Sequence, residues 1–253
     1  MPKKFRVATW NIAGARQIKS LNLFDYQPED VGYFSSEVKA VKPDFVCIQE
    51  DHVCKGKSVA QQIADSIGLN VVCSVSMSPS HIDKNCLLGM SVLSHNKRVD
   101  RKSTQLPYPD FKLLWKDGKE AERHNKYMQV VMVEGISVVN FFAPPIQIWG
   151  YDYDRGPGKI YAQMIEKLLL RLKRPLIICG DFNYNEPEDI YPRFSKKCGL
   201  SEALPKEITR PTTNNNFENP DHIFYSSEFL CTGAKVIKTN TDHFLCIAEL
   251  EMN

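Results

Sequence analysis

Short apolar runs that end in a polar side chain recur along the whole chain, and they limit the folds that the chain can adopt. Five segments end or begin such runs: TWN at 9–11, IQE at 48–50, GDFN at 180–183, PDHIF at 220–224 and TDH at 241–243. Apolar runs of about four to eight residues are typical of buried strands. Polar groups at strand ends do not serve the core, because burying them without partners costs free energy. The pattern predicts that they converge at one sheet edge, where a divalent cation and a phosphate can bind.

Segments with apolar residues at helical spacing alternate with the strand-like runs. Helices are expected over 31–41, 58–67 and 160–172. Strands are expected over 6–12, 44–49, 71–75, 87–93, 127–134, 136–142, 176–179, 223–225, 234–237 and 244–250. The polar segment 100–125 predicts a surface excursion, and Glu134-Gly135 predicts a hairpin turn. Helices and hairpins together predict mixed sheets with helices outside them, in a layered α/β sandwich.

The composition indicates one domain that spans residues 1–253. The chain is 43% hydrophobic and 25% charged, which is ordinary for a globular protein of this size. Its net charge of +2 is too small to attract nucleic acid unless basic residues cluster locally. No apolar run reaches the ~18–20 residues of a membrane span, and the N-terminus lacks the apolar region of a signal peptide. We therefore expect a monomeric, cytoplasmic protein.

Eight cysteines are expected to be free thiols. Cys47, Cys179 and Cys246 lie within predicted buried strands, and no CxxC motif occurs. Without a secretory signal, reduced cysteines are the usual state. Cys54 closely follows His52, but this pair alone does not make a zinc site, which normally needs a second pair of ligands.

The polar strand ends suggest individual roles. Glu50 follows a predicted strand and is a candidate ligand for Mg²⁺, which prefers oxygen ligands; a solvated loop glutamate is the alternative. Asp181 and Asn183 are two residues apart, so in an extended chain their side chains point the same way. The carboxylate would then orient or deprotonate a water and the amide would hold a phosphate oxygen, with Phe182 in the core. The alternative is an Asx turn that caps the strand.

A histidine near the C-terminus is a candidate for stabilising the transition state. His243 can donate a hydrogen bond to a phosphate oxygen, although a lone histidine is often structural. A carboxylate partner would raise its pKa and fix its orientation, and Asp221 is the candidate. The neighbouring His222 would then point away in a structural role. Asn11 supplies an amide that can bind either the phosphate or a metal-binding carboxylate.

The five segments, in this order, resemble the endonuclease/exonuclease/phosphatase superfamily. Its members include AP endonucleases, deadenylases, sphingomyelinases and inositol polyphosphate 5-phosphatases. The resemblance implies a four-layer α/β sandwich of two mixed β-sheets flanked by helices, and hydrolysis assisted by Mg²⁺ or Mn²⁺. It implies that Glu50 binds the metal and that Asp242 assists the metal or its waters. It carries catalytic roles over to Asn11, Asp181, Asn183, Asp221 and His243.

One position departs from the superfamily pattern. Most members present a histidine or tyrosine after the strand that here reads VVNFF, and Phe142 occupies that place. Phenylalanine neither donates a proton nor binds an oxyanion, so the resemblance implies a gap in the hydrogen-bonding ring. The residues considered as substitutes are Arg123, His124, Asn125, Tyr127, Tyr151 and Arg155.

A nucleic acid is the substrate that we expect, cleaved by a metal-dependent phosphodiesterase. The alternatives are a phosphatase or phosphodiesterase of a small or lipid-linked phosphate, and a catalytically weakened binding protein of the same fold. Aromatic residues of the 147–158 loop would stack on bases, or they would merely anchor the loop. A basic rim around the site would favour nucleic acid, and an apolar rim would favour lipid.

Overall fold

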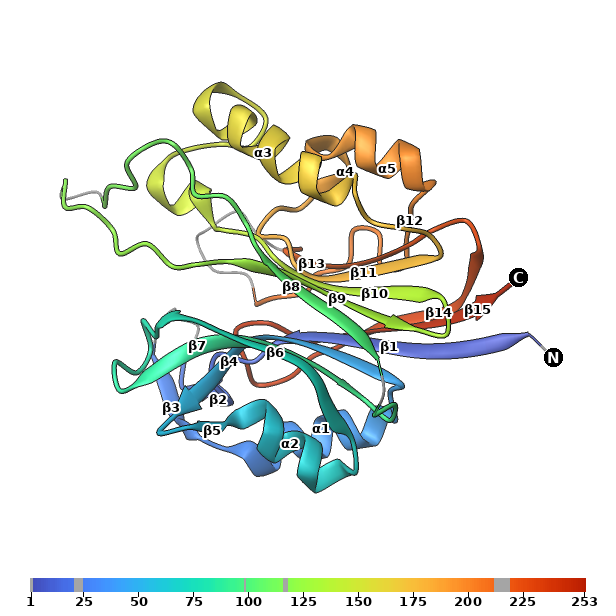
Figure 1. Cartoon of the computed structure of the whole chain (residues 1–253). Helices are drawn as coiled ribbons and strands as arrows, with labels where there is room; N and C mark the ends of the chain where they lie inside the picture. Colours follow the sequence, from blue (N-terminus) through green and yellow to red (C-terminus); the bar gives the residue numbers. More distant parts are fainter. Residues whose placement is uncertain (1, 21–24, 98, 116–117, 212–218) are drawn as a thin grey trace.

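Two β-sheets lie face to face, and each carries helices on its outer surface (Figure 1). The computed structural model describes residues 2–20, 25–97, 99–115, 118–211 and 219–253. Helices α1 and α2 cover the first sheet, and α3, α4 and α5 cover the second. This arrangement confirms the four-layer α/β sandwich of two mixed sheets. None of the described helices is long and apolar enough to cross a membrane.

The first sheet has seven strands in the order β14-β15-β1-β4-β7-β6, with β5 beside β4. Their bounds are β1 Lys3–Asn11, β4 Phe45–Cys54, β5 Lys57–Ser58, β6 Asn70–Pro79, β7 Cys86–Ser94, β14 Phe229–Ile237 and β15 Leu245–Met252. The second sheet has the order β12-β13-β11-β10-β9-β8. Its strands are β8 Asp100–Gln105, β9 Tyr127–Val133, β10 Ile136–Phe142, β11 Leu176–Asp181, β12 Ser201–Glu202 and β13 Asp221–Tyr225. One parallel pair occurs in each sheet, β1 with β4 and β10 with β11.

Five helices cover the sheets in the described part of the chain, and the first two begin at capping residues. They are α1 Val31–Val41, α2 Val59–Ile67, α3 Gly156–Leu169, α4 Pro187–Ile190 and α5 Pro192–Cys198, with a 3₁₀ turn at Ile146–Trp149. Asp30 and Ser58 accept hydrogen bonds from the first turns of α1 and α2, as good N-cap residues do. The first two predicted helices are thus confirmed, and α3 begins four residues before its predicted start. The short α4 and α5 were not predicted, because one or two turns give no helical periodicity.

Three apolar layers fill the spaces between the four layers of the sandwich. The layer between the sheets includes Val7, Phe45, Val131, Val138 and Ile177. A second cluster packs the helices α3 and α5 on one sheet, and a third packs α1 and α2 on the other. Phe182 belongs to the second cluster and is 2% exposed, so the prediction that it enters the core is confirmed.

Two strand predictions need correction. The strand predicted to end at Glu50 continues to Cys54, because a β-bulge between Gln49 and Asp51 absorbs Glu50 without ending the pairing with β7. The segment 100–125 is not wholly an excursion, since Asp100–Gln105 forms the edge strand β8. This strand escaped prediction because DRKSTQ is polar on both faces, as edge strands often are.

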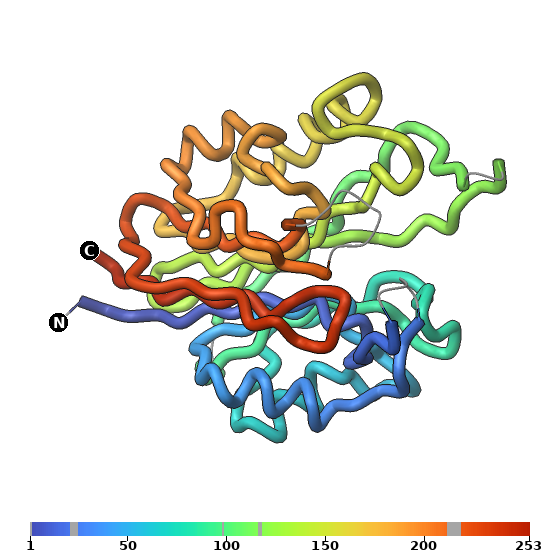
Figure 2. The backbone as a smooth tube through the Cα atoms, turned by 180° about the vertical axis from the view of Figure 1, so that it is seen from behind, coloured from blue at the N-terminus to red at the C-terminus, as the bar shows by residue number. Residues whose placement is uncertain are grey.

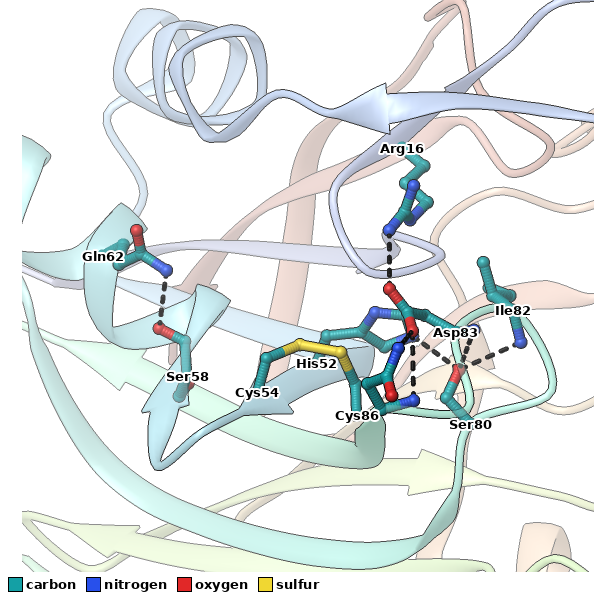
Figure 3. Close-up of a disulfide and its surroundings, with 10 residues drawn as sticks. Arg16, His52, Cys54, Ser58, Gln62, Ser80, Ile82, Asp83 and Cys86 are labelled. Atoms are coloured by element: carbon teal, nitrogen blue, oxygen red, sulfur yellow. Dashed lines mark hydrogen bonds and ion pairs between the residues drawn. A yellow bond between two sulfur atoms is a disulfide. The ribbon is translucent and has the colours of Figure 1, made fainter.

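The expectation that all cysteines are reduced is wrong for one pair. Cys54 and Cys86 face each other across β4 and β7 and form a disulfide, with their Cα atoms 4.4 Å apart (Figure 3). The pairing depends on strand register, which the sequence does not reveal. The bond links two neighbouring strands of the first sheet. The remaining six cysteines are free.

A buried set of amide side chains joins the two sheets. Asn140 on β10 donates through Nδ2 to the carbonyl oxygens of Ile48 (3.0 Å) and Ser91 (3.1 Å) in the opposite sheet. It also donates to Gln129 Oε1 at 3.0 Å, and its Oδ1 accepts from Gln49 Nε2 at 2.6 Å. Each of these buried polar groups would be costly without its partner. The set therefore favours one relative position of the two sheets.

We predict that Asn140→Ala lowers the free energy of unfolding by about 2–4 kcal/mol, because it leaves several buried polar groups unsatisfied. Urea unfolding followed by circular dichroism measures the change. Asn96→Ala is the control, since Asn96 is an exposed asparagine just after β7. Equal stability of the two variants would show that the amide set does not hold the sheets.

Candidate active site

The two chain termini lie together at one end of the sandwich (Figure 2). Strand ends from both sheets meet at the opposite end. Asn11 ends β1 in the first sheet, and Asp181 ends β11 in the second. The Asn11 Nδ2 atom donates to Asp181 Oδ2 at 3.1 Å, so the two sheets touch through these side chains. The segments TWN and GDFN, which are far apart in the sequence, therefore form one site.

Glu50 enters this site from the bulge in β4. Its backbone has the left-handed φ of +54°, which a bulge imposes and which turns the residue out of the regular strand alternation. Burial alone would raise the pKa of the Glu50 carboxyl group. The positive charges of His81, Lys126 and His243, with a hydrogen bond from Asn11, instead hold the pKa below its ordinary value. Glu50 is therefore an anion at neutral pH, as a ligand of a hard cation must be.

Asp181 is nearly inaccessible to solvent, at 1% exposure. Burial, helped by the negative charge of Asp221, raises the pKa of Asp181 to about 6, although His243, Lys126 and Asn11 act in the opposite direction. Its position depends on Gly180, where a Cβ atom would lie 1.9 Å from the Phe141 carbonyl oxygen of the neighbouring strand. Only glycine permits that close approach of β10 and β11.

Asn183 does not continue the strand as an extended residue. It has a left-handed φ of +51°, and its backbone N–H donates to Asp181 Oδ1 at 2.9 Å in an Asx turn. One N–H of its side chain donates to the Ala143 carbonyl oxygen at 2.8 Å. Of the two geometries that we considered, the Asx turn is therefore the one present. The turn still leaves Asn183 beside Asp181, and among the described residues its side-chain amide has no acceptor besides the Ala143 carbonyl oxygen.

His243 lies between two carboxylates. Its Nδ1 is 2.8 Å from Asp221 Oδ2, and its Nε2 is 3.9 Å from Asp181 Oδ2. Burial lowers the pKa of His243, but the carboxylates of Asp221 and Asp181 outweigh it and raise the pKa to about 9. The Trp10 indole donates to the His243 carbonyl oxygen at 2.9 Å and holds that backbone. The imidazole is therefore a positioned cation near neutral pH.

The adjacent histidine has the structural role that we expected. His222 Nδ1 lies 2.5 Å from Glu202 Oε1, and His222 Nε2 lies 2.8 Å from the Tyr184 carbonyl oxygen. Both ring nitrogens are thus engaged with residues outside the site.

Asp242 is held by a residue that the sequence analysis did not consider. Tyr26, on the short strand β3 (Tyr26–Glu29), donates its hydroxyl to Asp242 Oδ2 at 2.9 Å. Burial and the nearby charges of Asp242 and Glu50 raise the pKa of Tyr26, so its proton stays in place. The other oxygen, Asp242 Oδ1, is buried and has no hydrogen-bond partner among the described residues. Strand β3 carries no motif, so the sequence gave no sign of Tyr26.

Lys126 occupies the region where the sequence implied a gap. Its side chain is 8% exposed, and its Nζ lies 3.1 Å from the centroid of the Phe142 ring. Burial lowers the pKa of Lys126 to about 8, while the carboxylates of Glu50 and Asp181 act in the opposite direction. We had considered its neighbours as substitutes for the missing histidine or tyrosine, but not this residue. A lysine directly before a strand is too common to be a signal by itself.

Several of the substitutes that we considered are engaged elsewhere. Tyr127 donates to Gln105 Oε1 at 3.2 Å, and Tyr151 donates to the Lys112 carbonyl oxygen at 3.0 Å. Arg155 is 80% exposed and pairs with Asp152. The aromatic residues of the 147–158 loop therefore mainly anchor that loop.

The donor set of the site fits a divalent cation. The carboxylates of Glu50, Asp181, Asp221 and Asp242 gather at the site, and carboxylate oxygens are the ligands that a hard cation prefers. The buried, unpartnered Asp242 Oδ1 is an oxygen of the kind that Mg²⁺ and Mn²⁺ bind.

A second grouping in the same site is less suited to a metal. The side chains of Asp181, Asp221 and His243 also lie close enough to share an ion. His243 already uses Nδ1 on Asp221, however, and its positive charge opposes a cation. The Glu50 side of the site is therefore the better candidate for the metal.

Part of the rim near the site is apolar. Trp115, at 47% exposure, and Trp149 meet edge to face with ring centroids 5.9 Å apart. Leu114 and Ile148 beside them are also exposed. The segment that carries Ile148 and Trp149 is tied to the site, since Gln147 Nε2 donates to the Asn183 carbonyl oxygen. The apolar rim is the feature that we had associated with a lipid-linked substrate.

Comparisons with known proteins agree with this fold. An endonuclease/exonuclease/phosphatase from Beutenbergia cavernae is 13% identical, with a TM-score of 0.73 over 99% of this chain and 72% of that chain. The human Nocturnin catalytic domain with bound sulfate is 20% identical, with a TM-score of 0.62 over 100% and 94%. An AP endonuclease from Archaeoglobus fulgidus is 16% identical, with a TM-score of 0.57 over 96% and 98%. At these identities the likeness is one of fold.

No curated protein sequence matches the chain. The family model described as "Endonuclease/Exonuclease/phosphatase family" matches residues 8–243, from the TWN segment to the TDH segment. This match includes every segment that supplies the site. The chain therefore belongs to the endonuclease/exonuclease/phosphatase family.

Proposed function

We propose that the chain is a divalent-metal-dependent phosphodiesterase that hydrolyses nucleic acid. The observation that carries the proposal is the contact between Asn11 and Asp181, at 3.1 Å across the two sheets. This contact joins the Glu50 side of the site to the side that holds His243 and Asp221. A metal-binding carboxylate, a carboxylate for water and a cationic donor are thus held in one site, as in-line hydrolysis of a phosphate ester requires.

Each side chain has a chemical task in this proposal. Glu50, with Asp242 beside it, would hold Mg²⁺ or Mn²⁺, which neutralises charge on the phosphate when bound. Asp181 accepts a proton from the attacking water, and its raised pKa suits it to that task. His243 donates a hydrogen bond to a phosphate oxygen on which negative charge develops, and Asp221 keeps the ring in place. Asn11 and Asn183 position the groups around them.

The role of Glu50 predicts a loss of metal binding. Glu50→Gln should reduce the rise in melting temperature that Mn²⁺ produces and lower turnover by orders of magnitude, while the metal-free melting temperature changes little. Differential scanning fluorimetry with a Mn²⁺ titration measures the two melting temperatures, and initial rates on bis(p-nitrophenyl) phosphate measure turnover. Glu188→Gln, on an exposed glutamate of α4, is the control. Turnover like that of the wild type at low Mn²⁺ would exclude Glu50 as a ligand.

The chemical roles predict a different result. Asp181→Asn and His243→Ala should each lower kcat by ~10²–10³, because removing one group that stabilises developing charge has an effect of that size. Initial rates on bis(p-nitrophenyl) phosphate and on oligonucleotides measure the loss, and circular dichroism checks the fold. His95→Ala, an exposed histidine after β7, should keep full activity. A variant that kept more than about a tenth of the activity would lose its assigned role.

A nucleic acid is the substrate class that we propose first. One structure with this fold is named as an AP endonuclease, an enzyme that cleaves nucleic acid. The experiment that tests the class is a Mg²⁺-dependent panel of plasmid, single-stranded DNA, RNA, abasic duplex and inositol phosphates. Cleavage of the nucleic acids supports the proposal, and turnover of the inositol phosphates alone contradicts it.

A lipid-linked phosphate is the second candidate, and the apolar rim favours it. Trp115, Leu114 and Ile148 are exposed together, and tryptophan prefers the boundary between lipid and water. On this account Trp115→Ala should lower turnover of a vesicle-borne phosphodiester about tenfold, since burying a large apolar side chain contributes ~1.5–3 kcal/mol. Turnover of soluble bis(p-nitrophenyl) phosphate should stay unchanged. Equal turnover of the vesicle-borne phosphodiester by the wild type and by Trp115→Ala would exclude a lipid-linked phosphate as the substrate on this account.

A further inference from the structure

The Lys126 ammonium group has no hydrogen-bond acceptor among the described residues. The residue is 8% exposed, and the contact of its Nζ is with the Phe142 ring. Nζ is not among the fully buried atoms that lack a partner, so the end of the side chain reaches solvent. An ammonium group at the open side of an active site, with N–H groups that the protein does not use, is placed to bind an anionic ligand.

The Phe142 ring holds this ammonium in place. Nζ lies 3.1 Å from the ring centroid, within the range of a cation–π interaction. The ring is itself fixed, because Phe142 is 1% exposed and ends β10 in register with Asp181. A cation–π contact leaves N–H groups of the lysine free for another acceptor. Phe142 thus provides a platform for a donor, although it cannot donate a hydrogen bond itself.

The charges around Lys126 indicate which ligand it would accept. Both Glu50 and Asp181 attract its positive charge, so the ammonium lies in the field of the carboxylate proposed for the metal and the one proposed for water. Neither carboxylate pairs with it directly, and Asp181 is already bonded to Asn11. The remaining acceptor in a phosphoesterase site is the phosphate, and a lysine ammonium binds phosphate as a compact point charge.

We propose that Lys126 is a catalytic residue that binds a nonbridging oxygen of the substrate phosphate, with Phe142 as its positioning residue. The inference rests on the proposed function, since it names the side chain that holds the phosphoryl group. A different account is that Lys126 only balances the charge of Glu50 and Asp181. On that account its removal destabilises the ligand-free protein. On ours, Lys126 acts on the phosphate, so its removal weakens phosphate binding whether or not it changes the melting temperature of the ligand-free protein.

The test is the affinity for inorganic phosphate in the presence of Mg²⁺, followed by thermal shift in the full chain. Lys126→Met should weaken phosphate binding about 10–100-fold, the effect expected for a hydrogen bond to a charged group. Lys126→Arg, which keeps the charge, should recover most of the affinity. Lys112→Met is the matched control, because Lys112 is an exposed lysine before the same strand. The kcat/KM for bis(p-nitrophenyl) phosphate should fall ~10²-fold in Lys126→Met alone.

The role of Phe142 is tested with a double-mutant cycle. Phe142→Leu should weaken phosphate binding about fivefold in the wild type, as loss of a cation–π contact would. It should have no further effect in the Lys126→Met background, because the two residues act through one interaction. The same loss in both backgrounds would mean that Phe142 acts through packing and would overturn its role as a platform.

The outcomes separate this inference from the proposed function. Phosphate binding that depends on Lys126, without hydrolysis of any diester in the panel, would contradict the function and leave the inference standing. Equal phosphate affinity of the wild type and Lys126→Met would overturn the inference, whatever the turnover. So would the absence of phosphate binding by the wild type, or a loss in Lys112→Met as large as that in Lys126→Met.

Discussion

The hydrogen bonds of Asn140 fix how the two sheets of this protein lie against each other. Asn140 donates across the inner apolar layer to backbone carbonyls of β4 and β7. Gln49, in the opposite sheet, donates to the Asn140 side-chain oxygen. Apolar packing alone would tolerate small sliding of one sheet over the other, since it is not directional. The amide set removes that freedom. A contact such as Asn11 with Asp181 depends on this, because its two partners belong to different sheets.

Much of the architecture follows from the sequence because it depends on local signals. The apolar runs before Asn11 and Asp181 are typical of buried strands, which they form. Capping residues such as Asp30 indicate where helices begin. The pairing of His243 with Asp221 could be proposed because a motif placed both at strand ends. Such features need only the order of residues along one segment, or a pattern shared with a family.

The features that escaped prediction depend on register or on distant segments. The bond between Cys54 and Cys86 requires the exact alignment of β4 with β7, which the bulge at Glu50 shifts by one residue. Tyr26 reaches Asp242 from a strand that has no motif. Lys126 was not among the candidates, because nothing in the sequence around it shows that Phe142 would lie under it. Long-range geometry of this kind is set by the whole fold.

The left-handed backbone conformation of Glu50 disfavours a side chain at the position where the proposed chemistry needs a carboxylate. A residue with a side chain is disfavoured there by about 1 kcal/mol relative to glycine. Asn183, the other left-handed residue of the site, is of a type that tolerates this conformation well. Any procedure that selects variants for thermostability alone would therefore tend to replace Glu50 with glycine. Variants selected in this way would be more stable but would lack the Glu50 carboxylate, so stability and the proposed metal site make opposite demands on this position.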